Sequence, residues 1–240
     1  MSLIQRAARL LAAGLAAAAV GGCASANLAS VGAPVPAPDV RAGDAWTYVV
    51  LDGFRGFERG QRRFVVKSVQ GDTVTVEISD ENGAETRRFT RGWNPIDDET
   101  PAGNAVTYDP ALPLFRFPLE DGARWSQTVT ATDARTRARF RVWVDGRVLG
   151  RETVTTPAGT FDTVRIQRSL RIGDGETDIW RTDTLQVVTE WYAPAVGRSV
   201  RFRHDRNHYV DKMRGRDPMG NRIDWARERL GLVEYVRAPR

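Results

Sequence analysis

Apolar and polar residues alternate along most of the chain beyond residue 40. The clearest runs put their apolar side chains on one face and cover residues 74–78, 140–144, 164–172 and 185–191. Alternation of this kind is typical of β-strands with one face on a core and the other in water. Residues that favour turns separate the runs, at 71–72, 82–83, 145–146 and 157–159. The pattern predicts an all-β, mainly antiparallel fold.

Helical periodicity is weak outside the first twenty residues. The best candidate covers residues 221–230, where Ile223, Ala226 and Leu230 fall on one side and Gly231 offers a stop. We therefore expect little helix beyond the N-terminal segment.

The first 23 residues have the three zones of a secretory signal: a basic start, an apolar run and small residues before a cut. The apolar run, residues 10–20, is shorter than the ~20 residues of a membrane-spanning helix. Residues 1–22 are therefore predicted to be a signal peptide. Val20-Gly21-Gly22-Cys23 resembles the lipobox of bacterial lipoproteins, which implies cleavage before Cys23 and acylation (palmitate) of its thiol. The alternative is a plain signal with a chance cysteine.

The lipobox resemblance also implies a location in the cell envelope. Ala24 follows the cysteine, where an aspartate would resemble the signal for inner-membrane retention. We therefore expect a lipid-anchored protein at the outer membrane that faces the periplasm. Because Cys23 is the single cysteine, internal disulfides and clustered-cysteine metal sites are excluded.

Three segments are expected along the chain. Residues 24–38 are small, rich in proline and uncharged, so residues 23–40 are predicted to be the lipidated cysteine and a flexible tether. Residues 41–240 are predicted to form a single β-rich domain. Gly43-Asp44-Ala45-Trp46 recurs in a similar form as Gly122-Ala123-Arg124-Trp125, which indicates two loosely similar halves. The proline-rich join, residues 91–121, is interpreted as an irregular surface crossover or as a lid over a groove.

Three motifs carry a family resemblance. They are Val-Thr-Thr-Pro-Ala-Gly-Thr-Phe-Asp-Thr-Val-Arg-Ile at 154–166, Glu-Trp-Tyr-Ala-Pro-Ala-Val-Gly-Arg at 190–198, and Leu-Val-Glu-Tyr at 232–235. Together they resemble an uncharacterised family of β-rich envelope proteins with a "PAGTFD" hairpin. The resemblance implies a strongly curved sheet or open barrel, like those of lipoprotein-sorting factors, and it implies no enzyme activity. In the hairpin, Pro157 and Gly159 are predicted to form the turn and Phe161 to enter the core.

Basic charge is concentrated at the C-terminal end. Residues 196–240 contain 12 basic and 6 acidic side chains, whereas the whole chain has a net charge of +5. Arginine supplies all but two of the basic residues. A bias in codon composition explains this excess of arginine as well as nucleic-acid binding would. No nucleic-acid partner is therefore expected. The functional alternative is that this end faces an anionic envelope surface or a partner through five arginines: Arg201, Arg203, Arg206, Arg214 and Arg216.

The candidate chemistry is sparse. The acidic run Asp97-Asp98-Glu99 is interpreted as solvated rather than catalytic or calcium-binding, and His204 and His208 as polar strand residues rather than metal ligands. No nucleophile elbow or phosphate-binding loop is present. Of the seven tryptophans, Trp93 and Trp225 lie in irregular contexts, which makes them candidates for an apolar ligand site, although core filling is the alternative.

These observations predict a non-enzymatic envelope lipoprotein that needs no cofactor or metal. Its curved sheet is expected to bind an apolar (lipid) ligand or an envelope protein partner, and the N-terminal lipid to hold it at the membrane. The alternative is a structural or assembly subunit of an envelope complex with no ligand site. A cavity lined by tryptophan and phenylalanine under residues 91–121 would favour binding, and a solid core would favour the structural subunit.

Overall fold

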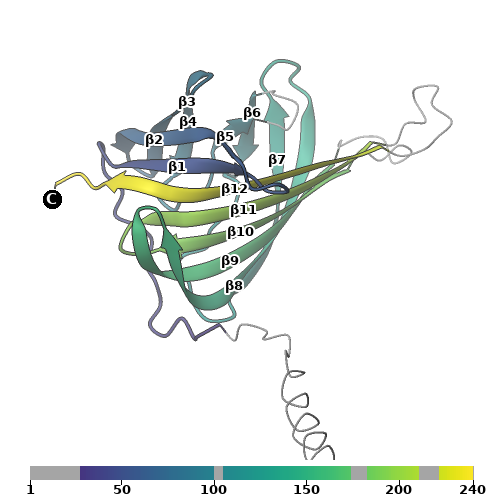
Figure 1. The fold of residues 1–240 in the computed structure, drawn as a ribbon. Helices are drawn as coiled ribbons and strands as arrows, with labels where there is room; N and C mark the ends of the chain where they lie inside the picture. Colours follow the sequence, from purple (N-terminus) through teal and green to yellow (C-terminus); the bar gives the residue numbers. More distant parts are fainter. Residues whose placement is uncertain (1–27, 100–104, 174–182, 211–221, 240) are drawn as a thin grey trace, which may run out of the picture.

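The computed structural model describes residues 28–99, 105–173, 183–210 and 222–239. Within these ranges twelve strands form one antiparallel sheet (Figure 1). The sheet order is β4-β3-β2-β1-β12-β11-β10-β9-β8-β7-β6-β5. The strands are β1 (Ala45–Asp52), β2 (Glu58–Gln70), β3 (Thr73–Asp80), β4 (Gly83–Thr90), β5 (Asp97–Glu99), β6 (Ala105–Asp109), β7 (Arg124–Asp133), β8 (Arg139–Thr156), β9 (Gly159–Gly173), β10 (Asp183–Ala193), β11 (Arg198–Val210) and β12 (Arg222–Val236).

The sheet curls until its outermost strands, β4 and β5, lie next to each other. Near the turn that joins them, the amide of Ile96 donates to the carbonyl of Arg88 at 2.8 Å. Farther along, side chains replace the backbone ladder: Arg88 Nε donates to Asp97 Oδ2 at 2.6 Å, and Arg87 pairs with Asp98. The result is a nearly closed barrel with one unsealed seam. The predicted all-β, strongly curved antiparallel sheet is confirmed.

The expectation of little helix is confirmed, and the candidate helix over residues 221–230 does not form, because this stretch belongs to β12. β12 lies between β1 and β11, and Leu230 is opposite Val50 on one side and Phe202 on the other. A strand between two neighbours has hydrogen-bond partners on both edges. That tertiary pairing overrides the weak helical spacing of three apolar residues.

The turn expected at residues 145–146 is also wrong, because β8 runs through this dipeptide. Glycine is required there for another reason: a Cβ on Gly146 would lie 2.1 Å from Cε2 of Trp125. Trp125, on β7, lies flat against the β8 backbone and donates from Nε1 to the carbonyl of Pro113 at 2.8 Å. A glycine inside a strand can therefore mark the close approach of a ring.

Residues 91–121 contribute to the barrel rather than cross its surface. They include β5 and β6, and Leu112, Phe115 and Leu119 are buried. Leu119 also exchanges two backbone hydrogen bonds with Val35, at 3.0 and 2.8 Å. The interpretation as an irregular surface crossover is wrong, since proline-rich stretches can still carry buried side chains between their prolines.

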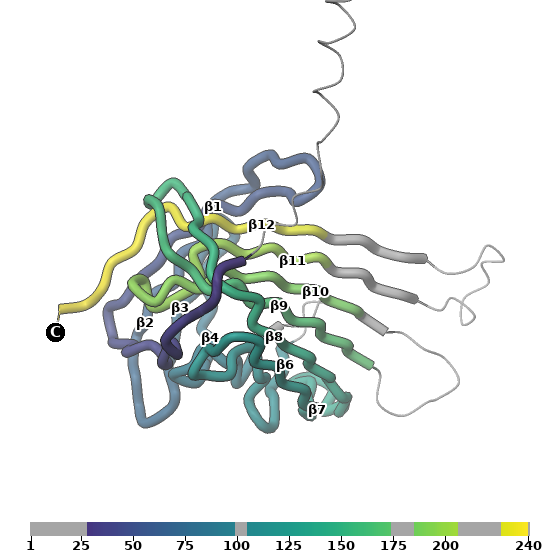
Figure 2. The backbone as a smooth tube through the Cα atoms, turned by 90° about the horizontal axis from the view of Figure 1, so that it is seen from below, coloured from purple at the N-terminus to yellow at the C-terminus, as the bar shows by residue number. Residues whose placement is uncertain are grey.

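Residues 28–40 pack against the barrel (purple in Figure 2). Val31, Val35 and Val40 are buried, and Ala29 forms a backbone bridge with Arg151 of β8. The prediction of a flexible tether is therefore wrong for this part of the chain, which we call the N-terminal strap. Composition alone misled the prediction, because widely spaced valines can each enter a core that other segments have built.

Residues 1–27 lie outside the described residues, and with them the predicted signal peptide, Cys23 and the first part of the tether. Within the described ranges, no helix is long and apolar enough to cross a membrane.

Asp121 ties the N-terminal strap to the barrel, which predicts a pH-dependent contribution to stability. Its carboxylate accepts hydrogen bonds from the hydroxyl of Ser30 and from the amide of Val31, the latter at 2.6 Å. These hydrogen bonds, that of Ser30 first, hold the pKa of Asp121 below its ordinary value. A lowered pKa stabilises the fold above the unfolded-state pKa of about 3.9, and this contribution is lost as the pH falls through the folded-state pKa.

We therefore expect Asp121→Ala to lower the melting temperature at pH 7 and to differ less from the wild type near pH 3. Differential scanning fluorimetry across this range measures the gap, with Glu120→Ala, an exposed neighbouring carboxylate, as the control. A gap that does not change with pH would show that the valines hold the strap without the carboxylate.

Candidate ligand-binding cavity

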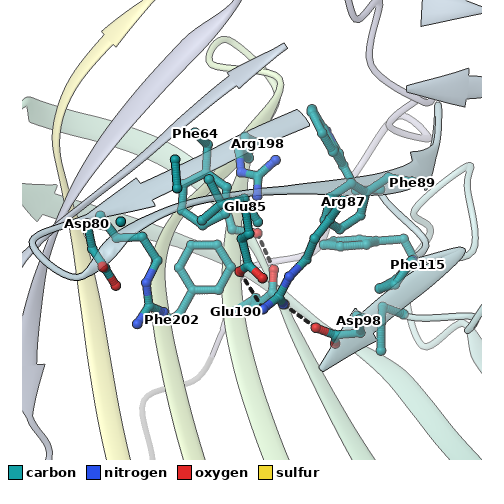
Figure 3. Close-up of a pocket in the computed structure, with 18 of the residues that line it drawn as sticks. Phe64, Asp80, Glu85, Arg87, Phe89, Asp98, Phe115, Glu190, Arg198 and Phe202 are labelled. Atoms are coloured by element: carbon teal, nitrogen blue, oxygen red, sulfur yellow. Dashed lines mark hydrogen bonds and ion pairs between the residues drawn. The ribbon is translucent and has the colours of Figure 1, made fainter. Parts of the chain in front are cut away.

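A cavity of about 610 Å³ lies against the β4–β5 seam (Figure 3). It is lined from β2, β3, β4, β5, β10 and β11 and from the connecting residues 93–95 and 114–115. Its volume falls in the range of about 300–1,000 Å³ that is usual for small-molecule sites. The lining combines a wall of aromatic side chains with several charged groups.

The aromatic wall comes from segments that are distant in sequence. Its members are Phe64, Phe89, Trp93, Phe115 and Phe202, with Ile78 and Leu114 beside them. Alternation directs Phe64, Phe89 and Phe202 to the inner face of the curved sheet, whereas Trp93 and Phe115 come from connecting segments. The wall can receive an apolar group without leaving a polar atom unpaired.

Trp93 is held in the wall by its turn. Its φ of 62° is uncommon for a residue other than glycine. The backbone amide donates to the carbonyl of Thr90 at 2.9 Å, and the indole Nε1 donates to the carbonyl of Gly197 at 2.8 Å. The ring also packs edge-on against Trp46, with centroids 5.4 Å apart. Trp93 is thus both a core residue and a cavity residue.

Arg198 places a buried guanidinium against the wall. It follows the turn at 194–197 and begins β11, and only 8% of its surface is exposed. Its guanidinium carbon lies 4.3 Å from the ring centre of Trp93, 4.5 Å from Phe64 and 5.3 Å from Trp46. Cation–π contacts of this kind offset part of the cost of burying the charge. Nevertheless, Nε and Nη1 of Arg198 have no hydrogen-bond partner among the described residues.

Glu190 and Arg168 form a second buried charge group beside the cavity. Arg168 is fully buried and donates through Nη2 to Glu190 and through Nη1 to the carbonyl of Leu114, the latter at 2.7 Å. Glu190 also accepts a hydrogen bond from the Ser199 hydroxyl at 2.5 Å. The negative charge of Glu190 is therefore compensated by Arg168.

Arg87 carries the charge nearest the seam. It pairs with Glu85 at 2.5 Å and with Asp98 across the seam. These side chains are partly exposed, so the ion pairs are screened and contribute little to stability. The main consequence of the Arg87–Asp98 pair is geometric, because it joins β4 to β5 at the side of the cavity, whereas the Glu85–Arg87 pair lies within β4 (Figure 3).

The candidates for ligand binding are placed differently by the structure. Trp93 lines the cavity. The backbone of Trp225 lies in β12 opposite Asn207, but its side chain lies outside the described residues. A ligand-binding role stays a prediction for both tryptophans. The position of Trp93 in the cavity lining is consistent with that role.

The remaining predicted residues lie away from the cavity centre or pair with neighbours. Asp97 and Asp98 form the seam ion pairs, and the ring of His204 on β11 contacts Gln186 Oε1 at 3.2 Å. No cluster of metal-ligating side chains occurs within the described ranges. The described part of His208 is its backbone in β11, opposite Thr184.

The "PAGTFD" residues lie at the β8–β9 hairpin. Gly159 pairs with Thr156 and has a φ of 131°, a region that side chains rarely adopt. Pro157 is in the turn, and Phe161 is partly buried, with its ring centroid 6.1 Å from that of Tyr235.

The basic end is only partly described. Arg203 pairs with Asp205 at 2.9 Å, and Arg201 donates to the carbonyl of Thr155 at 2.8 Å. The side chains of Arg206, Arg214 and Arg216 lie outside the described residues. The predicted contact of this end with an anionic surface stays a prediction.

Sequence reasoning missed the buried charges that border the cavity. Two signals were available. Arg168 interrupts the apolar face of the 164–172 run, and Glu190 and Arg198 are the first and last residues of the second family motif. A charge at a core position of a strand is rare unless it is paired or functional.

The chain is similar, at low identity, to solved structures of bacterial lipoproteins and exported proteins. A predicted lipoprotein of Parabacteroides distasonis is 19% identical, with coverage of 83% of this chain and 97% of that one and a TM-score of 0.45. A predicted exported protein of Bacteroides fragilis with a YmcC-like fold is 16% identical, with coverage of 85% and 100% and a TM-score of 0.44. The hypothetical lipoprotein YmcC of Escherichia coli is 13% identical, with coverage of 82% and 85% and a TM-score of 0.44.

No curated protein matches the chain. The family comparison covers β7 to β10 and most of β11, which includes the "PAGTFD" hairpin and both Glu190 and Arg198. The resemblance to an uncharacterised β-rich family is confirmed over this part of the chain: residues 122–209 match the model of the DUF3108-like family.

Proposed function

We propose that this chain is a non-enzymatic envelope lipoprotein whose barrel binds the apolar part of a small amphiphilic molecule. The observation that carries the proposal is the cavity of about 610 Å³ with its wall of four phenylalanines and Trp93. A subunit with a purely structural role would be expected to have a filled barrel. The rings of Trp93 and Phe115 come from residues 91–121, the segment that was expected to cover a groove if one existed.

The proposed location is the periplasmic face of the outer membrane. Its support is the lipobox-like Val20-Gly21-Gly22-Cys23 and the alanine that follows it. Two or three acyl chains on Cys23 would anchor the protein stably, since each buried methylene contributes about 0.8 kcal/mol.

Replacing Cys23 with serine is expected to leave the precursor uncut and to stop incorporation of labelled palmitate. The physical reason is that acylation uses the cysteine thiol, which serine lacks. Immunoblotting of membrane fractions measures processing, and Ser25→Ala provides a matched control nearby in the same segment. Normal processing and membrane retention of Cys23→Ser would overturn the proposed anchor.

The binding function is tested by native mass spectrometry of the protein purified from its own envelope in neutral-lipid nanodiscs. We expect lipid-sized adducts on the wild type and their loss in Ala84→Trp, because Ala84 is exposed at the cavity lining and a large ring there narrows access. Ala134→Trp, an equally exposed position outside the cavity lining, should keep the adducts. Absence of adducts from the wild type, together with no uptake of added fatty acid, would favour the structural subunit.

A further inference from the structure

Arg198 carries a buried positive charge that no carboxylate compensates within the described residues. Its exposed fraction is 8%, it lines the cavity, and its Nε and Nη1 have no hydrogen-bond partner there. Buried charged groups are normally paired and hydrogen-bonded, since leaving them unpaired costs free energy. The guanidinium carbon lies over the rings of Phe64 and Trp93, and these contacts do not replace the in-plane hydrogen bonds that Nε and Nη1 can donate.

The carboxylates that line the cavity are occupied elsewhere. Glu190 accepts from Arg168 and Ser199, Glu85 and Asp98 pair with Arg87, and Asp80 accepts from the backbone amide of Asn82 at 2.8 Å. Figure 3 shows the guanidinium of Arg87 between the carboxylates of Glu85 and Asp98. A positive charge therefore remains at Arg198 for a group that enters the cavity.

The neutral groups beside Arg198 do not compensate its charge. Burial raises the pKa of Tyr48, so its hydroxyl stays neutral. That hydroxyl donates to the carbonyl of Ser199 at 2.8 Å and forms a side-chain hydrogen bond with Arg198, which leaves Nε and Nη1 of Arg198 without a partner and its charge uncompensated. The indole Nε1 of Trp93 donates to a carbonyl as well, and so cannot accept from Arg198.

We propose that Arg198 binds the anionic head, a carboxylate or phosphate, of the amphiphile whose apolar part lies on the aromatic wall. This inference rests on the proposed function and adds to it the charge of the ligand. Oxygens of an anionic head would accept from Nε and Nη1, and the charge-assisted hydrogen bonds would be strong because the guanidinium is itself buried. A neutral ester of the same length would fill the wall but leave the guanidinium unpaired.

The test compares a brominated fatty acid, 9,10-dibromostearic acid, with its neutral methyl ester. Bromine quenches tryptophan fluorescence on contact, and Trp93 in the wall reports on occupancy. The full chain is titrated in neutral-lipid nanodiscs at pH 8, with empty nanodiscs used to correct for partitioning. We expect the acid to bind about 10- to 100-fold more tightly than the ester, the usual effect of hydrogen bonds to a charged group.

The variants separate recognition from architecture. Arg198→Gln is expected to bring the affinity for the acid down to that of the ester, and Arg198→Lys to keep part of the preference. Arg165→Gln is the matched control, because Arg165 also stacks on a tryptophan, with its guanidinium carbon 5.3 Å from the Trp191 ring, and also has a buried unpartnered Nε, but lies outside the cavity lining. It should retain the wild-type preference.

Two further titrations identify the source of the anion. Hexadecyl phosphate should displace the brominated acid, whereas inorganic phosphate alone should displace it only at far higher concentration. Equal potency of inorganic phosphate would keep the anion site but overturn the binding of an amphiphile. Equal affinity of the wild type for acid and ester would overturn the role of Arg198 while leaving the proposed function intact, and binding of neither would overturn both. The acid-to-ester comparison uses the wild type, so it decides the matter even if Arg198→Gln fails to fold.

Discussion

Replacing Glu190 with leucine is expected to lower the free energy of unfolding by about 3–5 kcal/mol, the cost of leaving a buried charge without its partner. Arg168 has no exposed surface and its Nη2 donates to Glu190. Without Glu190, Arg168 would keep its charge, since a guanidinium does not deprotonate in proteins. Urea unfolding followed by circular dichroism measures the loss.

The double variant Arg168→Met/Glu190→Leu separates the ion pair from the volume it fills. We expect it to be more stable than Glu190→Leu alone, because removing both charges also removes the unpaired buried one. The exposed pair of Arg151 and Asp162 is the control, and Asp162→Leu should change stability by less than about 1 kcal/mol. A double variant as unstable as Glu190→Leu would show that packing, not charge pairing, is what Glu190 provides.

Truncating Trp93 to alanine is expected to cost about 3–5 kcal/mol, the usual range for a buried tryptophan. Trp93 is 4% exposed, its ring packs edge-on against Trp46 and Phe89, and the ring centre lies 4.3 Å from the guanidinium carbon of Arg198. The same variant should also weaken ligand binding, because Trp93 forms part of the cavity wall.

Two companions define which part of Trp93 matters. Trp93→Phe keeps an aromatic ring but loses the hydrogen bond from Nε1 to Gly197, so a cost of about 1–3 kcal/mol is expected for the unpaired carbonyl. Trp143 also contacts an arginine, with the guanidinium carbon of Arg171 4.4 Å from its ring, but it is only half-buried on β8. Trp143→Ala should therefore lower the free energy of unfolding less than Trp93→Ala. Equal losses would contradict the larger contribution to stability that we expect from Trp93.

The alternation of apolar residues was sufficient to predict the class of fold. Each strand can bury one face only if apolar side chains recur at every second residue, and this requirement is local, so it can be read without coordinates. The same is true of glycine in the hairpin at Gly159, where a φ of 131° is a property of the turn itself. By contrast, the glycine at 146 suggested a turn and in fact makes room for a ring from the neighbouring strand.

The N-terminal strap shows where composition is a poor guide. Residues 28–40 look like a linker because they are small and rich in proline. Nothing in the local sequence predicts that the side chains of Val31, Val35 and Val40 are buried in the barrel. Burial of a side chain depends on what surrounds it, and the partners of this segment, such as Leu119 for Val35 and Arg151 for Ala29, are distant in the sequence. In the same way, the candidate helix at 221–230 does not form, because pairing with β1 and β11 on both edges outweighs local spacing.

The sequence by itself determined the strand class, the envelope-type N-terminus as an expectation, and Trp93 as a candidate. The tertiary structure alone decided that Arg198, Glu190 and Arg168 are the buried charges around the cavity, and which of them are paired. The role of a buried charge depends on the groups that surround it in the folded protein. Here Arg168 of β9 pairs with Glu190 of β10, whereas Arg198 contacts rings from β1, β2 and the β4–β5 turn. Alternation along one strand reports that a side chain points inward, but only the closed sheet decides whether an opposite charge, a ring or an empty cavity lies in front of it.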